Sequence, residues 1–113
     1  MAQGGLQGAR LAELHATALD LRDAMNAAFA QPSRVHGDAE TRARAAMARL
    51  TAATQMMEIM SWLLVRHAGS DLQMRWHTQL QAPRGLSGQR ATVAAAIDRL
   101  YAELVAINAG LEP

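Results

Sequence analysis

The sequence contains no cysteine and no lysine, and only 4% of its residues are aromatic. Without cysteine there is no disulfide, no thiol nucleophile and no cysteine-ligated zinc. All 11 basic residues are arginines, and 10 acidic residues leave a formal charge of +1, so no strong net field attracts nucleic acid or an anionic membrane. The apolar half of the chain is mainly alanine, leucine and methionine, which favour helices over strands. The composition therefore predicts an all-α protein.

Long hydrophobic runs are also missing. The first ten residues hold no continuous apolar segment of the kind found in a secretory signal. The longest nearly unbroken apolar run, Ile59 to Val65, is far shorter than the roughly 20 residues that span a bilayer. We therefore expect a cytoplasmic protein without a membrane span, and the length fits a single domain over residues 1–113.

Apolar residues recur at three-and-four spacing, the signal of an amphipathic helix, in three segments: 6–30, 39–68 and 87–109. Pro32 ends the first segment, Asp38 is a suitable N-cap for the second, and Gly69 is a typical stop after it. A further short helix within 71–81 would carry Leu72, Trp76 and Leu80. Three long helices with short connections predict an up-down-up bundle with a long middle helix and no β-sheet.

The middle helix is apolar over an arc of about 240° at 100° per residue, more than two neighbouring helices would cover. One apolar stripe suits a coiled-coil-like seam and holds Met47, Leu50, Thr54, Met57, Ser61, Leu64 and Ala68. The second holds Ala45, Ala52, Met56, Ile59, Met60 and Leu63. The surplus apolar surface predicts a homodimer with a two-fold contact, for which we expect the interface residues Met56, Met60, Leu63 and His67.

The remaining side of this helix is polar. It carries Gln55, Glu58 and Arg66, with Trp62 among them. Tryptophan and arginine are the residue types in which interfaces concentrate binding energy. These four residues are the candidate partner surface, although a packing role for Trp62 between bundle elements fits the sequence equally well.

No pattern indicates a reaction centre. The four histidines, at positions 15, 36, 67 and 77, form no Glu-x-x-His or His-x-x-x-His pair, so we expect no metal and no cofactor. Glu58 and Ser61 are neighbours on one helix, but no histidine has a spacing that would bring it to Ser61. The N-terminal glycines follow no strand and form no phosphate-binding loop. We therefore expect a protein that is not an enzyme.

The most specific stretch runs Met57-Glu-Ile-Met-Ser-Trp-Leu-Leu-Val-Arg-His-Ala68. It resembles the signature helix of the regulator of CtrA degradation family, with matching positions Leu50, Thr54, Met57, Ser61, Trp62, Leu63, Leu64 and Ala68. The resemblance implies a three-helix bundle that pairs as a dimer and acts as an adaptor, helping to deliver cell-cycle regulators to the ClpXP protease.

A small nucleic-acid-binding regulator is the alternative. It would need arginines from several helices to converge on one face. Such a regulator could contain a helix-turn-helix at Gly69 to Leu80, with Arg75 and His77 facing DNA. The sequence supports this motif only weakly, because the segment contains a single arginine. Salt-dependent binding to DNA of arbitrary sequence would separate this alternative from a protein adaptor.

Overall fold

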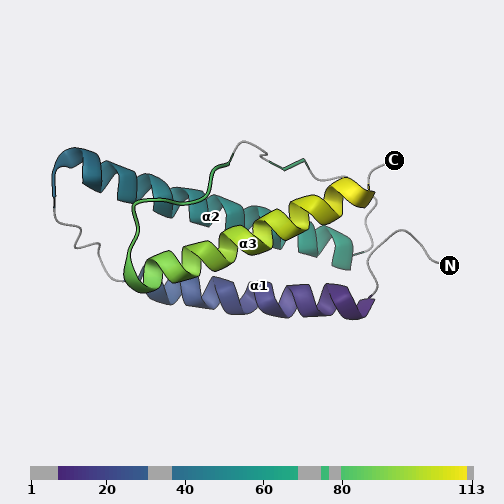
Figure 1. Cartoon of the computed structure of the whole chain (residues 1–113). Helices are drawn as coiled ribbons and strands as arrows, with labels where there is room; N and C mark the ends of the chain where they lie inside the picture. Colours follow the sequence, from purple (N-terminus) through teal and green to yellow (C-terminus); the bar gives the residue numbers. More distant parts are fainter. Residues whose placement is uncertain (1–7, 31–36, 69–74, 77–79, 112–113) are drawn as a thin grey trace.

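A computed structural model describes residues 8–30, 37–68, 75–76 and 80–111. Within these residues the protein consists of three helices and no strand: α1 (Gly8–Ala28), α2 (Ala39–His67) and α3 (Gly88–Leu111) (Figure 1). The all-helical class with three helices is confirmed. Of the further short helix expected within 71–81, residues 75–76 and 80–81 are not helical, and the others, Leu72 included, lie outside the described residues.

Asp38 begins α2, as its sequence position predicts. Its backbone is extended, and its carboxylate accepts a hydrogen bond from the Thr41 backbone N–H, with 2.8 Å between Oδ1 and N. This bond satisfies one of the N–H groups that the first helical turn leaves without an intrahelical partner. The same hydrogen bond stabilises the ionised carboxylate, so the pKa of Asp38 lies below its usual value.

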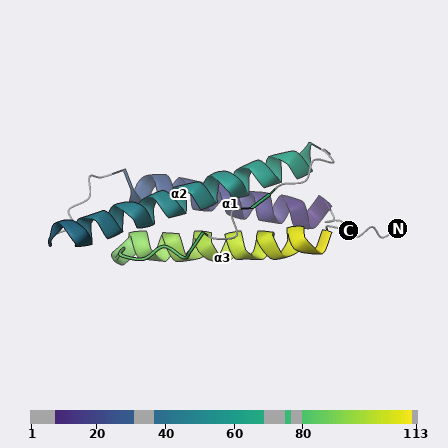
Figure 2. The same ribbon diagram turned by 90° about the horizontal axis from the view of Figure 1, so that it is seen from above.

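The predicted up-down-up order of the helices is wrong. α1 runs antiparallel to α2, but α3 runs parallel to α2 (Figures 1 and 2). Two hydrogen bonds between the helices establish that α2 and α3 are parallel. Gln55 pairs with Asp98, and Trp62, which comes later in α2, pairs with Asn108, which comes later in α3.

The connection between α2 and α3 makes this order possible. Residues 69–87 could span roughly 60 Å when extended, whereas α2 is roughly 44 Å long, so the chain can return to the start of α2 before α3 begins. Trp76 and Leu80 of this connection pack against the core, and Gly85 lies against Arg44 near the start of α2. The prediction of a short connection is therefore wrong, and with it the predicted direction of α3.

The core is one cluster shared by all three helices. Its largest fully buried side chains are Trp62, Ile59, Leu63, Ile97, Leu104 and Gln55. Trp76 from the connection lies edge-on to Tyr101, with 5.1 Å between ring centroids, and 6.3 Å from Trp62. The molecule is elongated, with extents of 56 × 25 × 17 Å.

Candidate functional site

The residues predicted for the dimer interface are mostly inside the bundle. Met56 and Leu63 are 2% and 0% exposed and belong to the core cluster with α1 and α3. Met60 is partly buried against the same cluster, and His67 is exposed, with its ring stacked 6.1 Å from that of His15. The prediction that Met56 and Leu63 contact a second copy of the chain is therefore wrong, because both side chains are buried in the core between the three helices.

The candidate partner surface is also largely interior. Gln55 and Trp62 are both 0% exposed and donate hydrogen bonds of 2.8 Å to Asp98 and Asn108 of α3. The Arg66 guanidinium lies 5.3 Å from the centre of the Trp62 ring.

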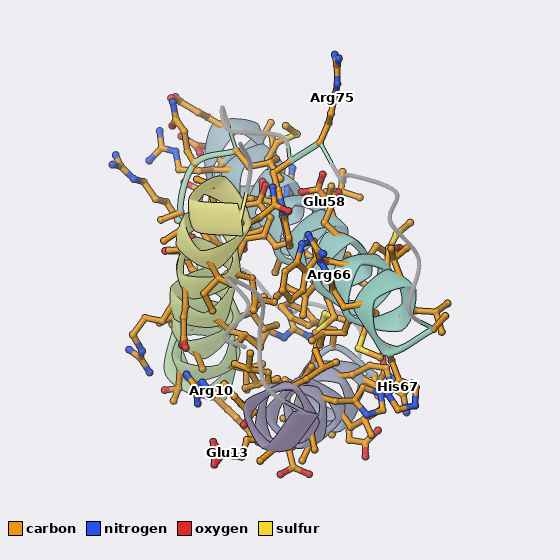
Figure 3. All side chains as sticks on the ribbon, turned by 90° about the vertical axis from the view of Figure 1, so that its right-hand side faces the viewer. Arg10, Glu13, Glu58, Arg66, His67 and Arg75 are labelled. Carbon is orange, nitrogen blue, oxygen red and sulfur yellow. The ribbon has the colours of Figure 1, made fainter. Side chains whose placement is uncertain are left out.

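Viewed along the bundle, Glu58 and Arg66 lie on the side of α2 that faces α3, whereas Arg75 points away from the helices (Figure 3). Both Glu58 and Arg66 are half-buried. The polar stripe thus joins α2 to α3 and the connection, and it does not form an outward surface as predicted.

The other apolar stripe of α2 is the one left uncovered. Among the described residues, the large hydrophobic side chains with the greatest exposure, 60–69% each, are Met47, Leu50, Met57 and Leu64. With the smaller Thr54 and Ser61 between them, they occupy alternating three-and-four positions over most of three heptads. We call these six residues the exposed α2 seam. The stripe and its coiled-coil spacing were predicted from the sequence, but the predicted intermolecular contact lay on the second apolar stripe.

A second feature is a hollow of about 560 Å³ beside the first half of α2. Its lining comes from the residue that follows α1, from α2, from the end of the connection and from the start of α3: Phe29, Arg42, Ala45, Ala46, Arg49, Leu50, Ala53, Leu86 and Arg90. We call it the arginine-rimmed hollow. This hollow was not predicted from the sequence. The available signal was the run of alanines interspersed with arginines, since alanines leave space where larger side chains would fill it.

Two of these arginines are held against an aromatic ring. The guanidinium carbons of Arg49 and Arg90 lie 5.6 and 5.2 Å from the centre of the Phe29 ring, within the range of cation–π attraction. Arg90 also donates from Nε to the Ala28 carbonyl oxygen at 3.0 Å, which ties the start of α3 to the end of α1. These contacts fix two positive charges at the apolar wall of the hollow.

Among the described residues, no group of three or more His, Cys, Asp or Glu side chains could hold a metal ion. His36 and His77 lie outside these residues. In the same part of the chain, no helix combines the length and the apolarity needed to cross a bilayer.

Residues 3–109 match a family described as "Protein of unknown function (DUF1465)". The chain belongs to this family. The match spans α1, α2 and all but the end of α3, so the exposed α2 seam and the arginine-rimmed hollow both lie inside the family region. Comparisons with curated proteins and with solved structures found no match.

Proposed function

We propose that this DUF1465 protein is a non-enzymatic adaptor that assembles as a homodimer through the exposed α2 seam. The observation that carries the proposal is the exposure of Met47, Leu50, Met57 and Leu64 on one face of a long helix. Each large apolar side chain left in water forgoes about 1.5–3 kcal/mol of burial free energy. A rigid helix with such a face is suited to docking against another helix.

A second copy of the chain is the partner that the spacing favours. Large side chains at Leu50, Met57 and Leu64 alternate with the smaller Thr54 and Ser61, so that knobs from one helix meet gaps in the other. All six seam residues are uncharged, so two copies can meet about a two-fold axis without opposing like charges within the seam. This contact replaces the interface expected from the sequence.

The adaptor role rests on the resemblance of residues 57–68 to the regulator of CtrA degradation family. By that resemblance, the partners are components of the ClpXP protease and a cell-cycle regulator that is delivered to it in the cytoplasm. An adaptor acts by raising the effective concentration of one protein near another and needs no reaction centre. A dimer would present two copies of each docking surface.

The oligomeric state is tested by sedimentation at micromolar concentration. We expect a dimer for the wild type and monomers for Met57→Asp and Leu64→Asp, both with unchanged helix content by circular dichroism. The control variant Ala102→Asp, which introduces the same charge at an exposed position of α3, should remain dimeric. A monomeric wild type would exclude the dimer.

The absence of cysteine allows the seam to be mapped directly. Single cysteines at Leu50, Met57 and Leu64 should all form intermolecular disulfides if the two α2 helices run parallel. If the helices run antiparallel, only the position nearest the two-fold axis should do so. A cysteine at Ala102 should not cross-link. Equal cross-linking at Ala102 and at the seam would place the contact elsewhere.

The adaptor role is tested by capture of purified ClpXP components on the immobilised protein. Nucleic-acid binding remains the second candidate, because arginines from different elements line two hollows beside the first half of α2: Arg42, Arg49 and Arg90 in one, Arg44 and Arg84 in the other. Capture of ClpXP supports the adaptor. Failure of capture, together with salt-sensitive binding to DNA of arbitrary sequence, would favour the alternative.

A further inference from the structure

From the geometry and charge of the arginine-rimmed hollow, we infer that it binds a small amphiphilic organic anion, a carboxylate attached to an apolar body. Its volume of about 560 Å³ lies within the 300–1,000 Å³ that is common for small-molecule sites. Such sites combine mostly apolar walls with a few placed polar groups. This inference does not depend on the adaptor role, and the hollow shares one residue, Leu50, with the exposed α2 seam.

The charge of the lining selects an anion. Arg42, Arg49 and Arg90 all reach the hollow, and its lining contains no carboxylate. Arg42 and Arg49 are seven residues apart, which places them on the same side of α2 roughly 10 Å from each other along the helix axis. Arg90 comes from α3. Guanidinium groups present paired N–H donors that match the two oxygens of a carboxylate.

The apolar walls select a ligand that is more than a bare anion. Phe29, Leu50 and Leu86 line the hollow together with three alanines of α2. Inorganic phosphate or a nucleic-acid backbone would engage the arginines but leave these walls uncovered. An alkyl or aromatic body attached to the carboxylate would cover them, and each buried CH₂ contributes about 0.8 kcal/mol.

The space itself follows from the helix lengths. α1 ends at Ala28, α3 begins at Gly88, and the first turns of α2 extend beyond that end of the bundle (Figures 1 and 2). Ala46 and Ala53 contribute only methyl groups to the wall. Since Arg49 and Arg90 are already held on Phe29, a ligand would meet charges that are positioned in advance, which lowers the ordering cost of binding.

The test uses 8-anilinonaphthalene-1-sulfonate, a fluorescent aromatic anion, as the probe on the full chain. We expect saturable fluorescence enhancement that decanoate displaces, with decanol and inorganic phosphate each at least about tenfold weaker as competitors. Decanol lacks the charge and phosphate lacks the apolar body. Equal competition by decanol, or by phosphate, would overturn the inference.

Variants locate the site. Arg42→Gln and Arg49→Gln should each weaken decanoate binding about tenfold or more, as expected for one lost charge-assisted hydrogen bond. Ala46→Phe should also weaken decanoate binding, because the added ring would occupy part of the hollow. Arg99→Gln, the same charge change at an exposed position of α3 outside the lining, should bind as the wild type does.

Two controls keep the result decisive. Circular dichroism checks that each variant is folded. Arg42 and Ala46 are exposed, so Arg42→Gln and Ala46→Phe test whether the hollow is the binding site even if Arg49→Gln is unstable. Leu64→Asp tests whether the probe lies on the exposed α2 seam instead. Loss of binding in Leu64→Asp, or unchanged binding in both Arg42→Gln and Ala46→Phe, would overturn the assignment.

Discussion

Replacing Trp62 by phenylalanine should destabilise the protein more than the small change in size suggests. The Trp62 side chain is fully buried, and its Nε1–H donates to the Asn108 Oδ1 across the α2–α3 contact at 2.8 Å. Phenylalanine keeps most of the apolar contact but removes this donor, so the buried Asn108 oxygen loses a hydrogen bond that water cannot readily replace.

The magnitude follows from two contributions. Depriving a buried polar atom of its partner costs about 1–3 kcal/mol. The smaller ring leaves a void beside Trp76, and core truncations of this kind cost about 1 kcal/mol or more. We therefore expect a loss of roughly 2–4 kcal/mol in the free energy of unfolding, which for a domain of this size lowers Tm by on the order of 10 °C.

Trp76→Phe is the matched control. The Trp76 Nε1 is buried and has no hydrogen-bond partner among the described residues, so the same substitution removes no such bond. Urea unfolding at one fixed protein concentration, as a dimer would require, should show a clearly smaller loss for Trp76→Phe.

A double-mutant cycle isolates the hydrogen bond. Asn108→Leu alone should also destabilise, and the combination of Trp62→Phe with Asn108→Leu should cost less than the sum of the two by about 1 kcal/mol. Equal losses for the Trp62 and Trp76 variants, or additive effects in the cycle, would refute the reasoning.

Two further predictions concern local structure. Gly85→Ala should lower the free energy of unfolding by about 1–3 kcal/mol in thermal denaturation, because Gly85 has a φ of +82° and an added Cβ would lie 3.1 Å from the Arg44 Cγ and close to the backbone behind it. The pKa of Asp38 is lowered in the folded state by its hydrogen bonds with Thr41, so its contribution to stability is complete above the unfolded pKa of about 3.9 and is lost as the pH falls through the folded pKa. Acid titration monitored by circular dichroism should therefore show that the free energy of unfolding of Asp38→Asn depends less on pH below pH 4 than that of the wild type. The same pH dependence in both proteins would contradict this assignment.

The sequence by itself determined where the three helices lie and, for α2, the residue that caps its start. Spacing of three and four along the chain defines a helical face without reference to any neighbour, and caps act within a few residues, as Asp38 does on Thr41. The two apolar stripes of α2 were visible for the same reason. So was the coiled-coil spacing of the exposed α2 seam.

Only the tertiary structure decided which stripe faces inward. Hydrophobic periodicity is the same whichever way a helix runs, so it does not reveal that α3 begins near the start of α2 and runs parallel to it. The parallel direction of α3 supplies Asn108 as the partner of Trp62, which the sequence places among polar residues. The arginine-rimmed hollow likewise needs Phe29, Arg49 and Arg90 from three separate helical regions, and contacts across such distances follow from packing, not from local spacing.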